Sequence, residues 1–123
     1  MANKILIVDD DAMLRKMYAK KFEIAGFDVA EAKDGEEGVR VASETKPNLV
    51  LMDVMMPRLD GFGALEKMRA GEETKNIPVI LLTNLGTNDA DKERGIKLGA
   101  AEYLIKNKLS PNEIVEKVKE YLK

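Results

Sequence analysis

Acidic, hydroxyl and ammonium side chains follow the ends of apolar runs in this sequence. Asp9 and Asp10 follow the first apolar run, Asp53 ends the third, Thr83 ends the fourth and Lys106 follows the fifth. If these runs are parallel strands, their carboxyl ends lie at one edge of a sheet, which is where ligands bind in open α/β sheets. Three carboxylates, a hydroxyl and an ammonium group are therefore expected to converge, although they lie far apart in the sequence.

Three carboxylates brought close together repel one another unless a cation relieves the repulsion. The chain has no Cys and no His, so any metal ion must be held by oxygen atoms. Carboxylate ligands with several positions left for water suit Mg²⁺ better than zinc or copper. The predicted cluster of Asp9, Asp10 and Asp53 therefore indicates a magnesium site.

Magnesium at such a site commonly holds a phosphate group, and an aspartate can itself take a phosphoryl group covalently. Negative charge spreads over the phosphoryl oxygens during transfer, and a metal ion and an ammonium group stabilise it. Lys106 and Thr83 lie where that stabilisation is required. The pattern predicts phosphoryl-transfer chemistry on one of the aspartates.

The elements that position these residues are five strands alternating with five helices. Strands are expected over 5–8, 27–32, 49–53, 79–83 and 103–105, and helices over 12–25, 36–44, 62–70, 88–98 and from 111 to the end. The first run is continuous and mostly β-branched, which is typical of a strand buried on both faces of a parallel sheet. Asp11 and Ser110 are expected to cap the first and last helices. Alternation with short loops predicts a doubly wound α/β fold.

Composition excludes several classes of protein. The 123 residues are enough for one domain, expected over 1–123, and 45% of them are apolar. Twenty basic against 22 acidic residues leave a net charge of -2, which argues against direct nucleic-acid binding. No apolar run approaches the roughly 20 residues that cross a bilayer, and no signal peptide is evident. A soluble, cytoplasmic protein without membrane insertion is expected, either standing alone or cut from a longer one.

Four motifs in order and in register carry a family resemblance. They are Val8-Asp9-Asp10, the run from Asp53 to Gly61 (DVMMPRLDG), Leu82-Thr83, and the run from Gly99 to Lys106 (GAAEYLIK). Together they resemble the receiver domains of two-component response regulators, in particular the single-domain chemotaxis type, over essentially the whole chain. The resemblance implies a flavodoxin-like five-stranded parallel sheet of order 2-1-3-4-5 with helices on both faces.

The resemblance also implies roles for the acidic residues. Asp53 would be the phosphoacceptor. Asp10, Asp53 and the backbone carbonyl of Met55 would be direct ligands of Mg²⁺, and Asp9 would act through water. The resemblance alone implies these roles, because the spacing of the residues does not assign them.

The remaining implied roles concern switching and partners. Lys106 would grip the phosphoryl group, Thr83 would turn its hydroxyl towards it, and Tyr103 would be the aromatic switch residue. The implied phosphodonor is a sensor histidine kinase or a histidine phosphotransfer protein, as in a phosphorelay. The implied output is a downstream protein, not identified by the sequence, that binds the face of the fourth helix, fifth strand and fifth helix.

The chain departs from the family pattern at Asn107, and Met55 and Leu85 bear on the lifetime of the phosphorylated state. Asn107 stands where most receivers have a proline with a cis peptide bond, and a cis bond without proline costs roughly 3 to 4 kcal/mol. A trans Lys106–Asn107 bond and an altered loop are therefore predicted. Met55 and Leu85 flank the expected path of a hydrolytic water and cannot orient it, so the phosphoaspartate is predicted to be long-lived.

Two other functions fit parts of the pattern. An aspartyl phosphotransferase or phosphatase would need its own acid or base and a substrate cap, which the sequence lacks, so the chain is expected to catalyse only its own phosphorylation and dephosphorylation. A phosphate-independent pseudo-receiver that acts as an interaction module is the main alternative. The set of Asp9, Asp10, Asp53, Thr83 and Lys106 argues against it, whereas Asn107 leaves it open.

Overall fold

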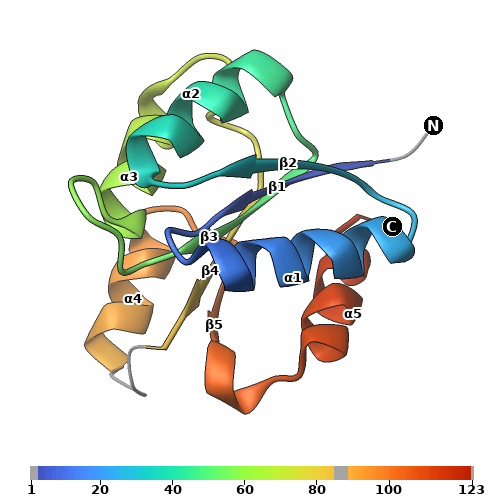
Figure 1. The fold of residues 1–123 in the computed structure, drawn as a ribbon. Coiled ribbons are helices and arrows are strands. Elements are labelled where there is room, and N and C mark those ends of the chain that lie inside the picture. Colours follow the sequence, from blue (N-terminus) through green and yellow to red (C-terminus); the bar gives the residue numbers. More distant parts are fainter. Residues whose placement is uncertain (1–2, 85–88, 123) are drawn as a thin grey trace.

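The protein folds as a parallel five-stranded sheet covered by helices on both faces (Figure 1). The structure is a computed structural model and describes residues 3–84 and 89–122. The strands are β1 (Lys4–Val8), β2 (Asp28–Ala32), β3 (Leu49–Asp53), β4 (Val79–Thr83) and β5 (Glu102–Ile105). Their order is β2-β1-β3-β4-β5 and every neighbouring pair is parallel. The predicted strand order and fold class are confirmed.

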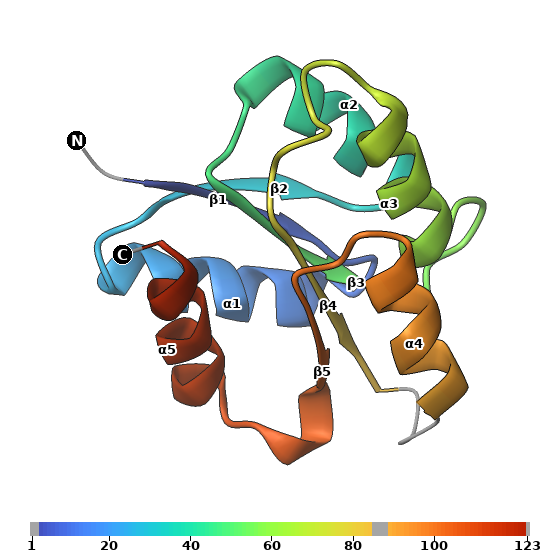
Figure 2. The same ribbon diagram turned by 180° about the vertical axis from the view of Figure 1, so that it is seen from behind.

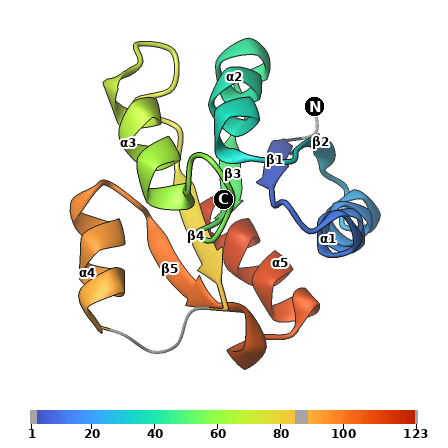
Figure 3. The ribbon, with the colours of Figure 1, turned by 60° about the vertical axis from the view of Figure 1, so that its left-hand side comes forward.

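The helices lie in two layers on either side of the sheet. They are α1 (Ala12–Ile24), α2 (Gly35–Thr45), α3 (Gly61–Ala70), α4 (Asp89–Lys97) and α5 (Pro111–Tyr121), with a short 3-10 helix η1 (Lys106–Lys108) after β5. Helices α1 and α5 cover one face, and α2, α3 and α4 cover the other (Figures 2 and 3). This is the arrangement of a doubly wound fold.

Each face of the sheet has its own hydrophobic core, because successive strand residues point to opposite faces. Leu6 and Val8 of β1 pack with α2 and α3, whereas Ile5 and Ile7 pack with α1 and α5. All residues of β3 and β4 are buried. The continuous apolar runs of the sequence are thus strands buried on both faces, and burial on both sides fixes their register.

Helix starts follow the predicted capping residues. The Asp11 side chain accepts hydrogen bonds from the backbone N–H groups of Met13 and Leu14. Ser110 and Glu113 form a reciprocal capping box at the start of α5, with bonds of 3.2 and 3.0 Å. Each cap satisfies backbone donors that have no partner inside the helix. The caps therefore set where α1 and α5 begin, and so where the preceding loops end.

Some boundaries differ from the predicted ones. Strand β2 begins at Asp28, because the Phe27 N–H donates to the Phe22 carbonyl at 3.0 Å in the turn that ends α1. Helix α2 begins at Gly35 behind the cap Asp34. Asn88, the predicted start of α4, lies outside the described residues, and α4 ends one residue before the predicted Leu98.

The segment after β5 contains an unpredicted turn of 3-10 helix. The Lys106–Asn107 peptide bond within it is trans, as predicted from the absence of proline. Among the described residues, no helix is both long and apolar enough to cross a membrane.

Candidate functional site

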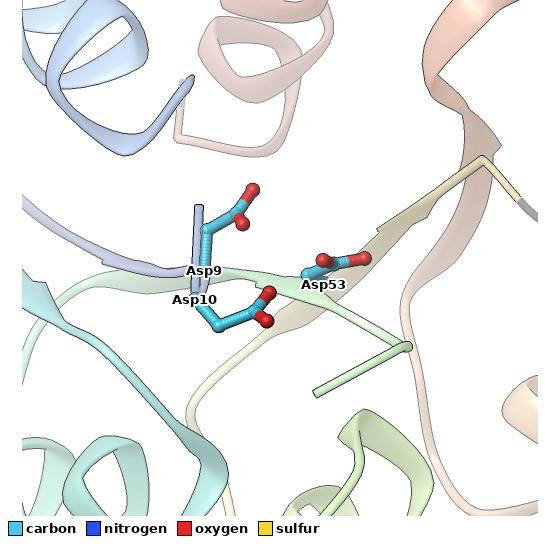
Figure 4. Close-up of side chains that lie close together, drawn as sticks. All are labelled: Asp9, Asp10 and Asp53. Carbon is cyan, nitrogen blue, oxygen red and sulfur yellow. The ribbon is translucent and has the colours of Figure 1, made fainter. Parts of the chain in front are cut away.

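Three carboxylates meet at the carboxyl ends of β1 and β3 (Figure 4). Val8 of β1 pairs with Met52 of β3, so the residues that follow these two positions lie side by side. One carboxylate oxygen each from Asp9, Asp10 and Asp53 lie within 4.8 Å of one another. Asp9 and Asp53 are buried, with 3% and 8% of their surface exposed, whereas Asp10 is exposed. The predicted acidic cluster is present, with one carboxylate open to solvent.

Lys106 reaches this cluster from the start of η1. Its Nζ donates a hydrogen bond of 2.9 Å to Asp9 Oδ2 and lies 3.5 Å from Asp53 Oδ2. Burial of the ammonium group opposes its charge, but the hydrogen bond with Asp9 and the charge of Asp53 outweigh burial and raise the pKa of Lys106. Lys106 is therefore a fixed positive charge inside the cluster.

The carboxyl group of Asp53 has an unusual affinity for protons. Its pKa is raised to about 6, because burial and the charge of Asp9, which raise it, outweigh the charge of Lys106, which lowers it. One ammonium group pairs with only two of the three carboxylates here, so their repulsion is only partly relieved. A buried carboxylate that gains a proton this readily is a group that a divalent cation would stabilise.

The donor set fits Mg²⁺. All available ligand atoms are oxygens, and the exposed position of Asp10 leaves space for water on its side of the cluster. Met55, whose carbonyl is the further expected ligand, lies in the loop directly after β3, and its backbone N–H donates a hydrogen bond to the Asp53 carboxylate. The Met55 side chain is 61% exposed. The site thus combines oxygen atoms that suit a magnesium ion with one cationic side chain.

Thr83 and Tyr103 lie beside the cluster along the sheet. Asp53 pairs with Leu82 on β4, and the fully buried Thr83 is the next residue along β4. Tyr103 lies on β5 opposite Leu81 and is only 6% exposed. Both residues are therefore within the sheet layer that connects Asp53 to β5.

The Tyr103 ring is held in an aromatic stack. It lies parallel to the Phe62 ring of α3 at 6.5 Å between centroids, and the Arg94 guanidinium of α4 lies 4.4 Å from the Phe62 centroid. The buried Tyr103 hydroxyl has no hydrogen-bond partner within the described residues. Burial, and then the charge of Asp91, raise the pKa of this phenol. A buried hydroxyl without a partner is costly.

Gly61 is a site residue that sequence reasoning missed. Its N–H donates to the Val54 carbonyl at 2.8 Å, which folds the loop back onto the end of β3. A Cβ atom at this position would clash with the Asp53 carbonyl oxygen and would lie 2.8 Å from Val54 Cα. The glycine directly after Asp60 in the DVMMPRLDG run was the available signal.

Replacing Gly61 by Ala is therefore expected to lower the free energy of unfolding by about 3 kcal/mol, because backbone atoms must move to accommodate the Cβ. The measurement is urea denaturation. Gly26→Ala is the comparison, since Gly26 has a φ of +98° but no atom near its Cβ position, and about 1 kcal/mol is expected there. Equal losses for both variants would contradict a close approach at Gly61.

A doubly wound sheet whose strand ends gather three aspartates and a lysine defines a receiver-type signalling domain. Residues 5–119 match the family described as the response regulator receiver domain. The chain belongs to this family, and the resemblance seen in its motifs is confirmed.

Individual proteins support the same assignment. The chain is 38% identical to "Probable transcriptional regulator ycf27" of Porphyridium aerugineum, over 98% of this chain and 48% of that protein. It is 41% identical to "DNA-binding dual master transcriptional regulator RpaA" of Synechocystis sp., over 84% and 42%. The chain spans about half the length of the curated relatives it matches. Chemotaxis protein CheY4 of Vibrio cholerae superposes with a TM-score of 0.91 at 28% identity, over 98% and 99% of the two chains.

Proposed function

We propose that this chain is a phosphorylation-dependent signalling switch in which Asp53 accepts a phosphoryl group. The observation that carries the proposal is the meeting of Asp53 with Asp9, Asp10 and the Lys106 ammonium at one end of the sheet. Membership of the receiver family supports it. As one receiver domain over 1–123, the chain would catalyse only its own phosphorylation and dephosphorylation.

The chemical step transfers a phosphoryl group from an oxygen or nitrogen atom of the donor to a carboxylate oxygen of Asp53. A carboxylate oxygen of Asp53 attacks the phosphorus of a donor, and the bond from phosphorus to the donor's leaving atom breaks. The leaving group departs with that electron pair. Asp53 must be ionised to attack. The reactive state of the site is therefore the one in which Mg²⁺ and the Lys106 ammonium favour the ionised carboxylate.

Asp10, Asp53 and the Met55 carbonyl would hold Mg²⁺ directly, with Asp9 acting through water. Bound there, the ion would neutralise charge on the phosphoryl oxygens. Lys106 leaves its bond with Asp9 and pairs with a phosphoryl oxygen, and Thr83 turns its hydroxyl towards another. These are roles for groups that already border the cluster.

The switch then runs from Thr83 to Tyr103. The phosphoryl group adds nearly two negative charges at the Thr83 and Lys106 end of the site. Movement of Thr83 changes the space beside Tyr103, whose hydroxyl lacks a partner among the described residues and whose ring packs on Phe62. The face formed by α4, β5 and α5 is the proposed output, reached by a shift in population between two conformations.

A sensor histidine kinase or a histidine phosphotransfer protein is the proposed donor, and a downstream protein the proposed target. Curated relatives about twice as long carry names that place them in transcription. Control of transcription is therefore a second candidate output. The net charge of -2 favours a protein target over DNA for this chain itself.

The experiment that tests the chemistry is intact mass after incubation with Mg²⁺ and acetyl phosphate. The expected result is a gain of one phosphoryl group in the wild-type protein, with no gain for Asp53→Ala or without Mg²⁺. Absence of any gain in the folded wild-type protein would favour the phosphate-independent interaction module, and Asn107→Pro would then be the first variant to make.

The lifetime of the phosphorylated state gives a separate prediction. Met55 has an exposed side chain beside the acceptor that cannot orient water, and Leu85, the second such residue, lies outside the described residues. Met55→Asn is expected to speed the loss of phosphate roughly tenfold, because an amide can position the attacking water. Release of inorganic phosphate measures it, with Met13→Asn, exposed at the start of α1, as the control. An unchanged rate for Met55→Asn would show that this position does not limit hydrolysis.

A further inference from the structure

Arg15 binds the turn that carries two of the three aspartates. It lies in the first part of α1, and its Nη1 donates a hydrogen bond of 2.8 Å to the backbone carbonyl of Asp9. Its Nε donates at 3.0 Å to Glu31 Oε1 on β2. Only 14% of the Arg15 side chain is exposed. One guanidinium thus connects the acidic turn to the neighbouring strand.

Further hydrogen bonds join the turn after β1 to β2 and to the start of α1. The Asp9 N–H donates to the Ala32 carbonyl on β2, and Glu31 is the residue directly before Ala32. The Asp11 N–H donates to Asp9 Oδ1 at 2.9 Å. Strand β2, the turn and α1 are therefore held together through both ends of Asp9, and Arg15 supplies the bond to its carbonyl.

The position of the Asp10 carboxylate depends on these hydrogen bonds more than the positions of the Asp9 and Asp53 carboxylates do. Within residues 3–84 and 89–122, no hydrogen bond or ion pair holds the exposed Asp10 carboxylate, whereas Asp9 and Asp53 both face Lys106. Its position is set by the backbone of the turn alone. Any loosening at the Asp9 carbonyl moves the base of the Asp10 side chain.

We propose that Arg15, oriented by Glu31, is a positioning residue that fixes the Asp9–Asp10 turn for cation binding. The inference rests on the proposed function, in which Asp10 is a direct ligand. An arginine suits this task because its planar fork makes both bonds at once, which a lysine cannot do. Residues behind metal ligands commonly change metal affinity about 10- to 100-fold when replaced.

Charge alone predicts the opposite effect. Arg15 is a cation close to a cation site, so removal of its charge would tighten Mg²⁺ binding if electrostatics were its only influence. Loss of positioning would weaken binding instead. The sign of the change therefore separates the two roles.

Lys16 is a matched control on the same helix. Its Nζ also pairs with Glu31, at 3.1 Å, but its side chain is 69% exposed and no bond joins it to Asp9 among the described residues. Lys16→Met removes one ion pair with Glu31 and leaves the hydrogen bond from Arg15 to the Asp9 carbonyl in place. Arg15→Met removes an ion pair with Glu31 and also that hydrogen bond.

The experiment is a calorimetric titration of the phosphate-free protein with Mg²⁺. Arg15→Met is expected to raise the Kd for Mg²⁺ about tenfold, and Arg15→Lys to raise it several-fold because only one of the two bonds is retained. Lys16→Met is expected to leave the Kd within about twofold of the wild-type value. Amide resonances of Asp10 and Asp11 should also broaden in metal-free Arg15→Met and stay sharp in Lys16→Met.

An unchanged or lower Kd in Arg15→Met would overturn the proposal while leaving the phosphorylation switch intact. Equal weakening in Lys16→Met would overturn it too, since the Glu31 pair and not the Asp9 carbonyl would then matter. If Arg15→Met does not fold, Arg15→Lys and Glu31→Gln carry the same test with the same expected direction. No Mg²⁺ binding by the wild-type protein would overturn the proposed function together with this inference.

Discussion

Lys106→Met is expected to slow phosphorylation of Asp53 by acetyl phosphate about 100-fold and, at the same time, to tighten Mg²⁺ binding about tenfold. The two effects have opposite signs because Lys106 has two partners in turn. In the unphosphorylated protein its ammonium lies 2.9 Å from Asp9 and 3.5 Å from Asp53, where it competes with a bound cation. During transfer it stabilises charge on the phosphoryl oxygens.

Two measurements on one variant check this prediction. Calorimetry gives the Kd for Mg²⁺, and the rate of mass gain under saturating Mg²⁺ gives the transfer rate. Lys108→Met is the control, since Lys108 lies in the same 3-10 turn with an exposed side chain. A fall in both affinity and rate would mean that the Lys106 replacement disrupts the site instead of removing one charge from it.

Asp53→Asn is expected to stabilise the metal-free protein at neutral pH. The folded-state pKa of Asp53 is about 6, against 3.8 for an ordinary aspartate, so the folded state holds a proton between these values that the unfolded chain has lost. This contribution to stability is fully present below about pH 4 and is lost as the pH rises through 6. Since a tenfold change in proton affinity is worth about 1.4 kcal/mol, ionised Asp53 costs up to about 3 kcal/mol.

Urea denaturation of metal-free protein as a function of pH measures this cost. Asp53→Asn should exceed the wild-type free energy of unfolding by about 2 kcal/mol at pH 8, and the difference should shrink to near zero at pH 4. Asp28→Asn, an exposed position at the start of β2, should show no comparable gain. A constant difference at all pH values would mean that the amide stabilises the protein by packing and not by removing a buried charge.

Magnesium should abolish most of that difference at pH 8. A cation held by the wild-type carboxylates stabilises the folded state by mass action, and Asp53→Asn lacks one of those ligands. The wild-type unfolding midpoint should therefore rise with Mg²⁺ concentration more steeply than that of the variant.

The layers and strand order were predictable because burial leaves a strong pattern. Strands β3 and β4 are buried on both faces, so each is a continuous apolar run that ends at a polar residue. Asp11 and Ser110 mark helix starts through side-chain bonds that are local in sequence. Local chemistry of this kind can be recognised without the fold.

The meeting of Asp9, Asp53 and Lys106 followed from the register of parallel strands, which needs only the strand ends. Arg15 was missed because its partner atoms, the Asp9 carbonyl and a Glu31 oxygen, depend on how α1 lies across β2. The stack of Arg94, Phe62 and Tyr103 was missed for the same reason, since it joins α4, α3 and β5. Contacts among three elements leave no periodic signal in a single sequence.

The turn after β5 was only partly predictable. Absence of proline at Asn107 indicated a trans bond, which the structure has. The 3-10 geometry of η1 depends on Leu109, whose N–H donates to the Lys106 carbonyl. It also depends on the packing of the Leu109 side chain against the core that α1 and α5 cover. Packing of this kind is set by the assembled fold.

In the proposed switch, phosphorylation of Asp53 changes the face formed by α4, β5 and α5. The most direct measurement is a comparison of backbone amide NMR spectra with Mg²⁺ alone and with Mg²⁺ and excess acetyl phosphate, with phosphorylation verified by mass. Phosphorylation is expected to shift the resonances of Thr83, Tyr103 and residues along α4 and α5, with α2 unchanged as an internal reference. Shifts confined to the immediate neighbours of Asp53 in a fully phosphorylated protein would contradict a switch.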